Sequence, residues 1–279
     1  MKTLNYEINE LFLIGSKLLN SKIESEIIIR DSLNITKEEF YLSLRNKIDY
    51  SDYENIIKKF NLRKNGYPLS YITNKKYFLD YEFIVNEGVF IPRFETEEIV
   101  YNFIKKFSKF KNSLDICCGT GVIGISLILN NLTDKCTFVD ISDKAIYNTF
   151  LNLKKFNIDK NRYEIIKSDM FKNLKSKYDL IISNPPYIKI LEYDNLPKDV
   201  KIEPKEALIS GFDGLNHIKI LINESKNFLN KGGILIFEFE KEQLKHFEDK
   251  LINFKIIQII KTYSDNILGI MLEKLWYNF

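Results

Sequence analysis

The chain has 279 residues, 45% of them hydrophobic and 14% aromatic, which is enough to bury one full core and a second, smaller one. Its 41 Lys and Arg nearly balance 38 Asp and Glu, which leaves a formal net charge of +3. So small an excess excludes a strongly basic surface as the dominant feature of the chain, and we expect no direct nucleic-acid partner.

Cysteine and histidine, the residue types that most often carry metal and redox chemistry, are scarce. Cys117, Cys118 and Cys136 are an odd number without C-x-x-C spacing, which argues against a disulfide framework or a structural zinc site and indicates a reducing compartment. His217 and His246 lie in polar helical contexts, so we expect them on the surface rather than as a base or metal ligand. No metal site is therefore expected.

The amino-terminal part of the chain predicts a bundle of helices. Segment 1–19 mixes Glu with its apolar residues, so it has the pattern of neither a signal peptide nor a membrane span, and no other run reaches membrane length. Three Ser/Thr-x-x-Glu capping boxes mark helix starts, at Ser21 and Glu24, Thr36 and Glu39, and Ser51 and Glu54. We expect a helical domain over 1–70, and the sequence leaves open whether it binds a partner or acts as a lid.

Aromatic and β-branched residues follow from Tyr77 to Ile91, with Asn86-Glu87-Gly88 in the middle. A glycine-containing turn between two such runs predicts a β-hairpin, and we expect segment 71–92 to connect two domains. A helix is then expected over 95–110, at the start of a larger domain that covers 93–279.

This larger domain alternates short apolar runs with amphipathic helices. Strands are expected at 114–116, 136–140, 163–166, 180–182 and 234–239, helices at 124–130, 143–156 and 215–229 with Gly232-Gly233 as the last helix stop, and an antiparallel pair at 256–263 and 267–272. The β/α rhythm predicts an α/β fold with a doubly wound, mostly parallel sheet.

A glycine loop leaves the first strand of this sheet and enters a helix. It reads Asp115-Ile116-Cys117-Cys118-Gly119-Thr120-Gly121. Glycines let the backbone approach a ligand closely, and a helix amino terminus favours negative charge. Asp140 ends the second strand, where it can accept hydrogen bonds from ribose hydroxyls, so the two features indicate a nucleoside-bearing cofactor.

Two cofactor classes fit that loop. Residues 119–124 match G-x-G-x-x-G, and Asp140 lies near the spacing expected of a dinucleotide-binding acid. Asp115 favours S-adenosylmethionine instead, because its carboxylate could hold a methionine ammonium directly or through water. Ser168-Asp169-Met170-Phe171 favours it as well, since it sets a carboxylate and an apolar pair where an adenine would lie.

The tetrapeptide Asn184-Pro185-Pro186-Tyr187 follows the apolar run 178–182 with only Ser183 between them. Two prolines must end a strand, and open α/β sheets bind ligands at the carboxyl ends of their strands. The side-chain oxygen of Asn184 and the backbone carbonyl of Pro185 can accept hydrogen bonds from an NH2 group on a planar substrate. A purely structural Asx turn explains the tetrapeptide equally well on its own.

With these motifs in order, the chain resembles the peptide chain release factor glutamine N5-methyltransferase family, within the class I S-adenosylmethionine-dependent methyltransferases. The segments that carry the resemblance are 68–73, Ile91-Pro92-Arg93-Phe94-Glu95-Thr96-Glu97, 115–121, 168–171, 183–188 and Glu203-Pro204-Lys205-Glu206-Ala207-Leu208. The family implies a seven-stranded Rossmann-like sheet, with the helical domain 1–70 recognising the substrate protein.

The resemblance also implies a reaction and a site. Asn184 and Pro185 would grip a glutamine amide while Pro186 and Tyr187 wall it in, and methyl transfer to the glutamine of the Gly-Gly-Gln motif in class I release factors would leave S-adenosylhomocysteine. The implied cofactor contacts are Asp115, Cys117, Cys118, Gly119, Thr120, Gly121, Asp140, Asp169, Met170 and Asn184. The implied enzyme is a cytoplasmic monomer without membrane attachment.

Other activities stay open beside this one. They are glutamine methylation of a ribosomal protein, amino-group methylation of a nucleic acid and, on the glycine loop alone, dinucleotide oxidoreduction. Four departures from the family pattern bear on the site: Cys117 for a glycine, Phe94 for a proline, Met170 for an aromatic residue, and Glu238-Phe239-Glu240 for E-x-G.

Overall fold

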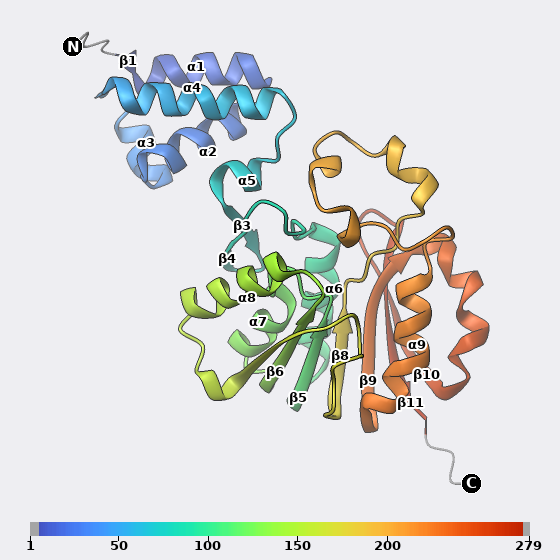
Figure 1. Ribbon diagram of the computed structural model, residues 1–279. Coiled ribbons are helices and arrows are strands. Elements are labelled where there is room, and N and C mark those ends of the chain that lie inside the picture. Colours follow the sequence, from blue (N-terminus) through green and yellow to red (C-terminus); the bar gives the residue numbers. More distant parts are fainter. Residues whose placement is uncertain (1–5, 276–279) are drawn as a thin grey trace. The chain divides into compact units, whose positions relative to one another are not determined.

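The computed structural model describes residues 6–275, which form two compact units (Figure 1). The first unit runs up to Lys75 and includes the distant segment Pro197–Ile202. The second contains Lys76–Leu196 and the residues from Glu203 onward. The functional division into 1–70, 71–92 and 93–279 stays a prediction.

The first unit is a bundle of short helices around its own core. Its elements are α1 (Ile8–Leu19), α2 (Lys22–Leu33), α3 (Lys37–Leu42), α4 (Tyr50–Lys64) and α5 (Leu69–Thr73), with β1 (Tyr6–Glu7) pairing antiparallel to β2 (Lys47–Ile48). Leu11, Ile28, Phe40 and Phe60 are fully buried between the helices and hold them together by apolar burial.

Two of the three predicted helix starts carry the expected Ser or Thr cap. Thr36 and Glu39 form the full capping box, and the hydroxyl of Ser21 accepts from the Glu24 amide. The box at Ser51 and Glu54 is wrong, because the carboxylate of Asp49 accepts from the Asp52 amide at 2.9 Å and caps α4. Asp is as good a cap as Ser and begins the helix earlier.

The second unit is built on a seven-stranded sheet, mostly parallel, which confirms the predicted fold class. Its strands are β5 (Phe110–Ile116), β6 (Thr133–Asp140), β7 (Tyr163–Lys167), β8 (Tyr178–Ser183), β9 (Leu229–Glu240), β10 (Phe254–Lys261) and β11 (Ile267–Lys274). They lie in the order β10-β11-β9-β8-β5-β6-β7, and β11 is antiparallel to both of its neighbours. The predicted closing antiparallel pair is therefore present.

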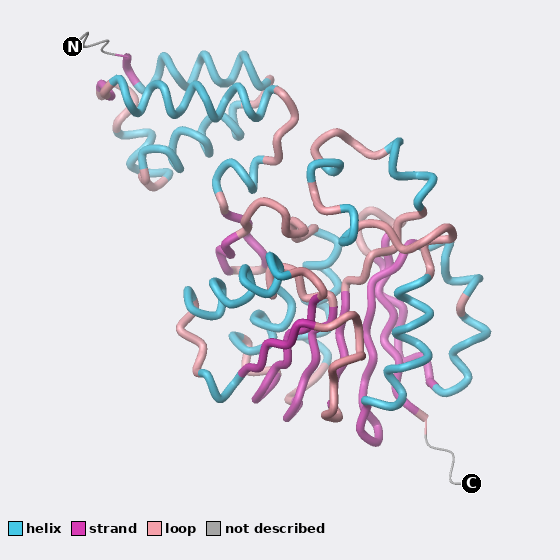
Figure 2. The backbone as a smooth tube through the Cα atoms, viewed as in Figure 1, coloured by secondary structure: helices cyan, strands magenta, loops and turns pink. Residues whose placement is uncertain are grey.

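Helices cover both faces of this sheet (Figure 2). One apolar core joins α6 (Phe94–Lys106), α7 (Val122–Leu129) and α8 (Asp143–Lys155) to Leu180 and Ile182 of β8, and the other joins α9 (Asn216–Phe228) to Ile181. Because β8 is buried on both faces, its sequence is a continuous apolar run rather than an alternating one.

Two turn predictions based on glycine are wrong. The small hairpin consists of β3 (Lys75–Phe78) and β4 (Tyr81–Ile84), so its turn lies at 79–80, where Leu79 has φ +53°, and not at Asn86-Glu87-Gly88. Helix α9 ends at Phe228, and Gly232-Gly233 lie within β9 instead. Between the pairs Tyr178–Leu229 and Leu180–Ile234 the register of β9 shifts, and glycines accommodate such a bulge.

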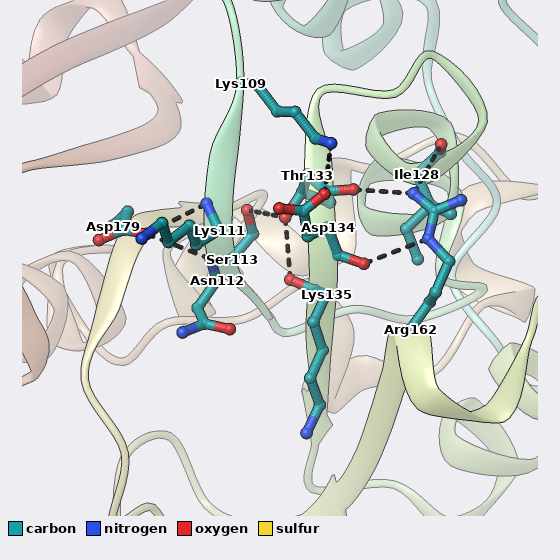
Figure 3. A network of polar contacts seen from close by, with 10 residues as sticks. All are labelled: Lys109, Lys111, Asn112, Ser113, Ile128, Thr133, Asp134, Lys135, Arg162 and Asp179. Atoms are coloured by element: carbon teal, nitrogen blue, oxygen red, sulfur yellow. Dashed lines mark hydrogen bonds and ion pairs between the residues drawn. The ribbon is translucent and has the colours of Figure 1, made fainter.

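A network of polar contacts holds the amino-terminal parts of β5, β6 and β8 together (Figure 3). The hydroxyl of Ser113 donates to Thr133 at 2.8 Å, and the carboxylate of Asp179 accepts from the amides of Lys111 and Asn112. Arg162 donates to the Thr133 carbonyl at 2.9 Å. These contacts lie toward the strand ends opposite to those where α/β sheets bind ligands. Within residues 6–275, no helix combines the length and apolar character needed to cross a membrane.

We expect Gly124→Ala to destabilise the second unit by about 1–3 kcal/mol, the usual cost of overpacking a core. A Cβ at Gly124 would lie 2.4 Å from the ring of Phe138 and 2.7 Å from the sulfur of Cys136. Urea unfolding measures the effect. Ser126→Ala is the matched control on the same helix, since it removes a buried hydroxyl that has no partner within the described part of the chain. Equal stability of both variants would contradict this packing.

Candidate active site

A cavity of about 230 Å³ opens in the second unit, where the carboxyl ends of β5, β6 and β8 meet. Seven of the site residues predicted from the sequence line this cavity: Cys117, Gly119, Asp140, Asp169, Met170, Asn184 and Pro186. The other six are not part of the lining: Asp115, Cys118, Thr120, Pro185 and Tyr187 are adjacent in sequence to lining residues, and Gly121 lies two residues after Gly119. The structure therefore brings together the glycine loop, the second-strand acid, the Asp169 segment and the tetrapeptide.

The glycine loop is strongly curved. Cys117, Gly119 and Gly121 all have positive φ, at +59°, +55° and +77°. A Cβ added to Gly119 would meet no protein atom within 4 Å, so this glycine faces open space at the cavity. Cys117 adopts a conformation that costs a non-glycine residue about 1–2 kcal/mol, so the site of this departure from the family pattern is strained. Its sulfur lies 3.6 Å from that of Met170.

Asp140 joins two loops at the cavity wall. Its Oδ2 accepts from the Gly119 amide and its Oδ1 from the Ser142 amide, both at 2.9 Å. Burial raises the pKa of this carboxyl, while the amide of Ser142 and then that of Gly119 lower it. Each carboxylate oxygen keeps a lone pair for a further donor, so Asp140 can still accept from a hydroxyl in the cavity.

Asp115 does not reach the cavity. Its side chain is fully buried, Oδ2 accepts from the Gly124 amide at 2.8 Å, and Oδ1 has no partner within residues 6–275. Burial raises the pKa of Asp115 to about 7. The contact that the structure shows for Asp115 holds the first turn of α7, and its contact with a methionine ammonium stays a prediction.

The sequence analysis missed three buried polar residues of α8, two of which form hydrogen bonds to the glycine loop. Thr149 donates to the Gly119 carbonyl at 3.0 Å, and Asn152 donates to the Thr120 carbonyl at 2.9 Å. Asn152 also accepts from the amide of Ile84, and its neighbour Asn148 makes the same kind of contact to Asn86. The available signal was a pair of asparagines at helical spacing on the buried face of an amphipathic helix.

The tetrapeptide is tied to two other motifs by a chain of hydrogen bonds. The amide nitrogen of Asn184 donates to the hydroxyl of Thr96 at 2.8 Å, and Thr96 donates to Oε2 of Glu238 at 2.7 Å. The hydroxyl of Tyr187 donates to the other oxygen of Glu238 at 3.0 Å. Glu238 is the first residue of the segment Glu238-Phe239-Glu240, which departs from E-x-G.

Two further motifs meet beside the cavity. Glu203 is buried, pairs with the guanidinium of Arg93 and accepts from the Ile91 amide at 2.9 Å. This clamp joins the Ile91-Pro92-Arg93 segment to the segment that starts at Glu203, whose next residue, Pro204, lines the cavity. Phe94, another departure, is 58% exposed, so its ring packs little against the fold.

His217 also lines the cavity, and its expected surface position is wrong. Its Nδ1 lies 2.8 Å from the hydroxyl of Ser210, which also accepts from the His217 backbone amide. Burial lowers the pKa of His217, which favours the neutral ring. Local sequence gave no signal, since only folding brings the start of α9 to the cavity. Within residues 6–275, no cluster of His, Cys, Asp and Glu suits a metal ion.

The seven-stranded sheet with helices on both faces is a Rossmann-like fold that solved methyltransferase structures share. Residues 81–199 match the family described as Methyltransferase small domain. Two solved structures share the fold: the tRNA m1G37 methyltransferase of M. jannaschii (TM-score 0.52, 18% identity, 73% of this chain and 57% of that chain) and the 16S rRNA N2 G1207 methyltransferase of T. thermophilus in complex with AdoMet and guanosine (TM-score 0.52, 14% identity, 72% and 50%).

Curated relatives show which family of methyltransferases the chain belongs to. The release factor glutamine methyltransferase of Borreliella burgdorferi is 33% identical over 92% of this chain and 90% of its own length, and that of Clostridium botulinum is 33% identical over 92% and 88%. The ribosomal protein uL3 glutamine methyltransferase of Francisella tularensis is 38% identical over 70% of this chain and 61% of its own. The chain belongs to the family of release factor glutamine methyltransferases.

We expect Asp115→Asn to remove part of the pH dependence of stability. The pKa of Asp115 is higher in the folded than in the unfolded chain, so the folded state binds more protons in the interval between the two values and loses stability as pH rises toward 7. Between pH 5 and 8 this group should lower the free energy of unfolding by roughly 2 kcal/mol.

Urea unfolding of both proteins at pH 5 and 8 isolates this contribution, because every other group is common to them. Asp134→Asn, at an exposed strand end, serves as the control and should keep the wild-type slope. A D115N slope equal to that of wild type would show that Asp115 is ionised throughout.

Proposed function

We propose that this protein transfers the methyl group of S-adenosylmethionine to the side-chain amide nitrogen of the glutamine in the Gly-Gly-Gln motif of class I release factors. The observation that carries the proposal is the orientation of Asn184. Its side-chain NH2 donates to the hydroxyl of Thr96 at 2.8 Å. The side-chain oxygen, Oδ1, therefore remains free to accept a hydrogen bond at the cavity wall. A substrate NH2 is the complementary group.

Four of the lining residues would hold the cofactor. Gly119 leaves room for close backbone approach, Asp140 retains acceptor capacity for ribose hydroxyls, and Asp169 and Met170 offer a carboxylate and an apolar side chain for an adenine. Cys118, Thr120 and Gly121 would act by shaping the loop. When bound, the cofactor supplies an electrophilic methyl group on a sulfonium.

The residues of the tetrapeptide would position the amide nitrogen without deprotonating it first, and the nitrogen would release one of its protons after it takes the methyl group. An amide nitrogen is a weak nucleophile because its lone pair is delocalised. Acceptors at Asn184 Oδ1 and at the carbonyl of Pro185 would hold its two hydrogens and orient the lone pair toward the methyl donor. Pro186 lines the cavity beside them, and Tyr187 is held by Glu238. Alignment at about 3–3.5 Å supplies much of the rate enhancement in such a reaction.

The proposal also covers the role of the helical domain, the compartment and the second candidate substrate. The helical domain 1–70 would recognise the release factor, and the enzyme would act in the cytoplasm as a monomer during the cycle of translation termination. The similarity to the uL3 glutamine methyltransferase makes a ribosomal protein the second candidate substrate, because the same acceptors would fit its glutamine amide.

Asn184→Ala should lower methyl transfer by at least about 100-fold, since it removes the side-chain acceptor that aligns the amide. Labelled S-adenosylmethionine is incubated with purified release factor or with protein uL3, and intact-protein mass spectrometry counts added methyl groups. Asn161→Ala, an exposed asparagine in the same unit, should keep full activity. No label on either substrate above the N184A background rejects the proposal, and label on uL3 alone selects the second candidate.

Gly119→Ala should weaken binding of S-adenosylhomocysteine by about tenfold or more, because the new methyl group would project into the space at the cavity and Ala resists a positive φ. Gly232→Ala is the matched control: its φ is +67°, its added Cβ also meets nothing within 4 Å, and it lies in β9 outside the cavity lining. Calorimetry should find near-wild-type affinity for G232A. Equal losses in both variants would mean that backbone strain, and not the cavity, explains the effect.

A further inference from the structure

We propose that Glu238, acting through Thr96, is the positioning residue that decides which end of the Asn184 carboxamide faces the cavity. The inference rests on the proposed function, in which Oδ1 of Asn184 receives the substrate NH2. Glu238 and Thr96 touch no substrate, and their role is to fix the residue that does.

The three residues come from three different elements of the second unit. Thr96 lies in the first turn of α6, Glu238 near the end of β9, and Asn184 directly after β8. Thr96 is 4% and Glu238 1% exposed, so no bulk water competes for their hydrogen bonds. The contacts of 2.8 Å and 2.7 Å therefore form a closed path from the carboxylate to the carboxamide.

The direction of this path follows from donor and acceptor counting. An ionised carboxylate can only accept, so the hydroxyl proton of Thr96 must point at Glu238. The remaining capacity of the Thr96 oxygen is then acceptor only, and the neighbouring Asn184 must turn its NH2 toward it. Since the two ends of a carboxamide have nearly the same shape, no steric contact could make this choice.

A reversed Asn184 would present NH2 to the substrate NH2. Two donors would face each other in a partly desolvated cavity, and the substrate amide would lose an acceptor that the proposed reaction needs. An unmade hydrogen bond of this kind costs more than a formed one contributes. The Glu238 carboxylate therefore selects the productive state of Asn184 without contacting the substrate.

The same carboxylate also fixes the ring of Tyr187, whose hydroxyl donates to the second oxygen. The first and last residues of the tetrapeptide are thus both held by the buried carboxylate of Glu238, Asn184 through Thr96 and Tyr187 directly. Burial raises the pKa of Glu238 to about 7, the hydroxyls of Thr96 and Tyr187 lower it, and Glu95 and Arg93 at the start of α6 act on it in opposite directions. On β11, Gly269 lies opposite and brings no charge.

Protonation of Glu238 would remove its control over the orientation of the Asn184 carboxamide. A neutral carboxyl can donate to Thr96, which frees the Thr96 proton for Asn184 and allows the carboxamide to reverse. Turnover should therefore rise with pH through the neutral range as Glu238 ionises.

The test compares Thr96→Val with Thr96→Ser. Valine keeps the shape of threonine and removes the hydroxyl, so T96V should lower kcat for glutamine methylation by about 10–100-fold and flatten its pH profile. Affinity for S-adenosylhomocysteine should stay within about threefold of wild type, because Thr96 does not line the cavity. T96S restores the hydroxyl and should recover most of the activity. Wild-type turnover in T96V, or an equal loss in T96S, overturns the inference.

A second measurement needs no substrate. In amide-labelled protein, the side-chain NH2 resonance of Asn184, identified by its absence from N184A, should shift as pH passes through the neutral range and lose that shift in T96V. If it titrates in this way while no protein substrate is methylated, the relay stands and the proposed function fails. If the resonance does not respond to pH and is the same in T96V, the relay is wrong whatever the enzyme methylates.

Discussion

Parallel pairing at the centre of the sheet is the constraint on which the site depends. Ile116 of β5 pairs with Val139 of β6 on one side and with Ser183 of β8 on the other, so the three strands end at one level. The residues that follow them are the glycine loop, Asp140 and the tetrapeptide at Asn184. Segments separated by long stretches of sequence are thereby brought to one cavity, and a change of register would separate them.

Buried carboxylates organise the loops that this pairing brings together. Asp115 holds the start of α7, Asp140 joins two loops through their amides, and Glu238 joins two hydroxyls. In each case N–H or O–H donors, rather than an ion pair, compensate part of the desolvation of the carboxylate, and burial still raises its pKa. These three groups orient neutral dipoles without an ion pair of their own, whereas the buried Glu203 beside the cavity pairs with Arg93.

The sequence predicted the parts of the fold that depend on apolar periodicity. The seven strands of the large sheet and the helices between them follow from it, because a buried face must repeat along the chain. Turns at Leu79 and at Gly232 were misplaced, since a glycine signal marks a bend without saying whether it is a hairpin, a bulge or a cavity loop. His217 was missed because its position depends on where α9 begins relative to β8.

The tetrapeptide could be found from sequence, but what orients it could not. Glu238-Phe239-Glu240 departs from the family only at its third position, and alternation along β9 sends Phe239 into the core beside Phe247 while Glu238 faces Thr96. At the departing position, the amide of Glu240 donates to Gln243, which in turn donates to the carbonyl of Tyr187 at 3.0 Å. The departure at Glu240 therefore leaves Glu238, the acid that positions the site, in place. Gln243 adds a second hydrogen-bonded contact to the tetrapeptide, at the carbonyl of Tyr187.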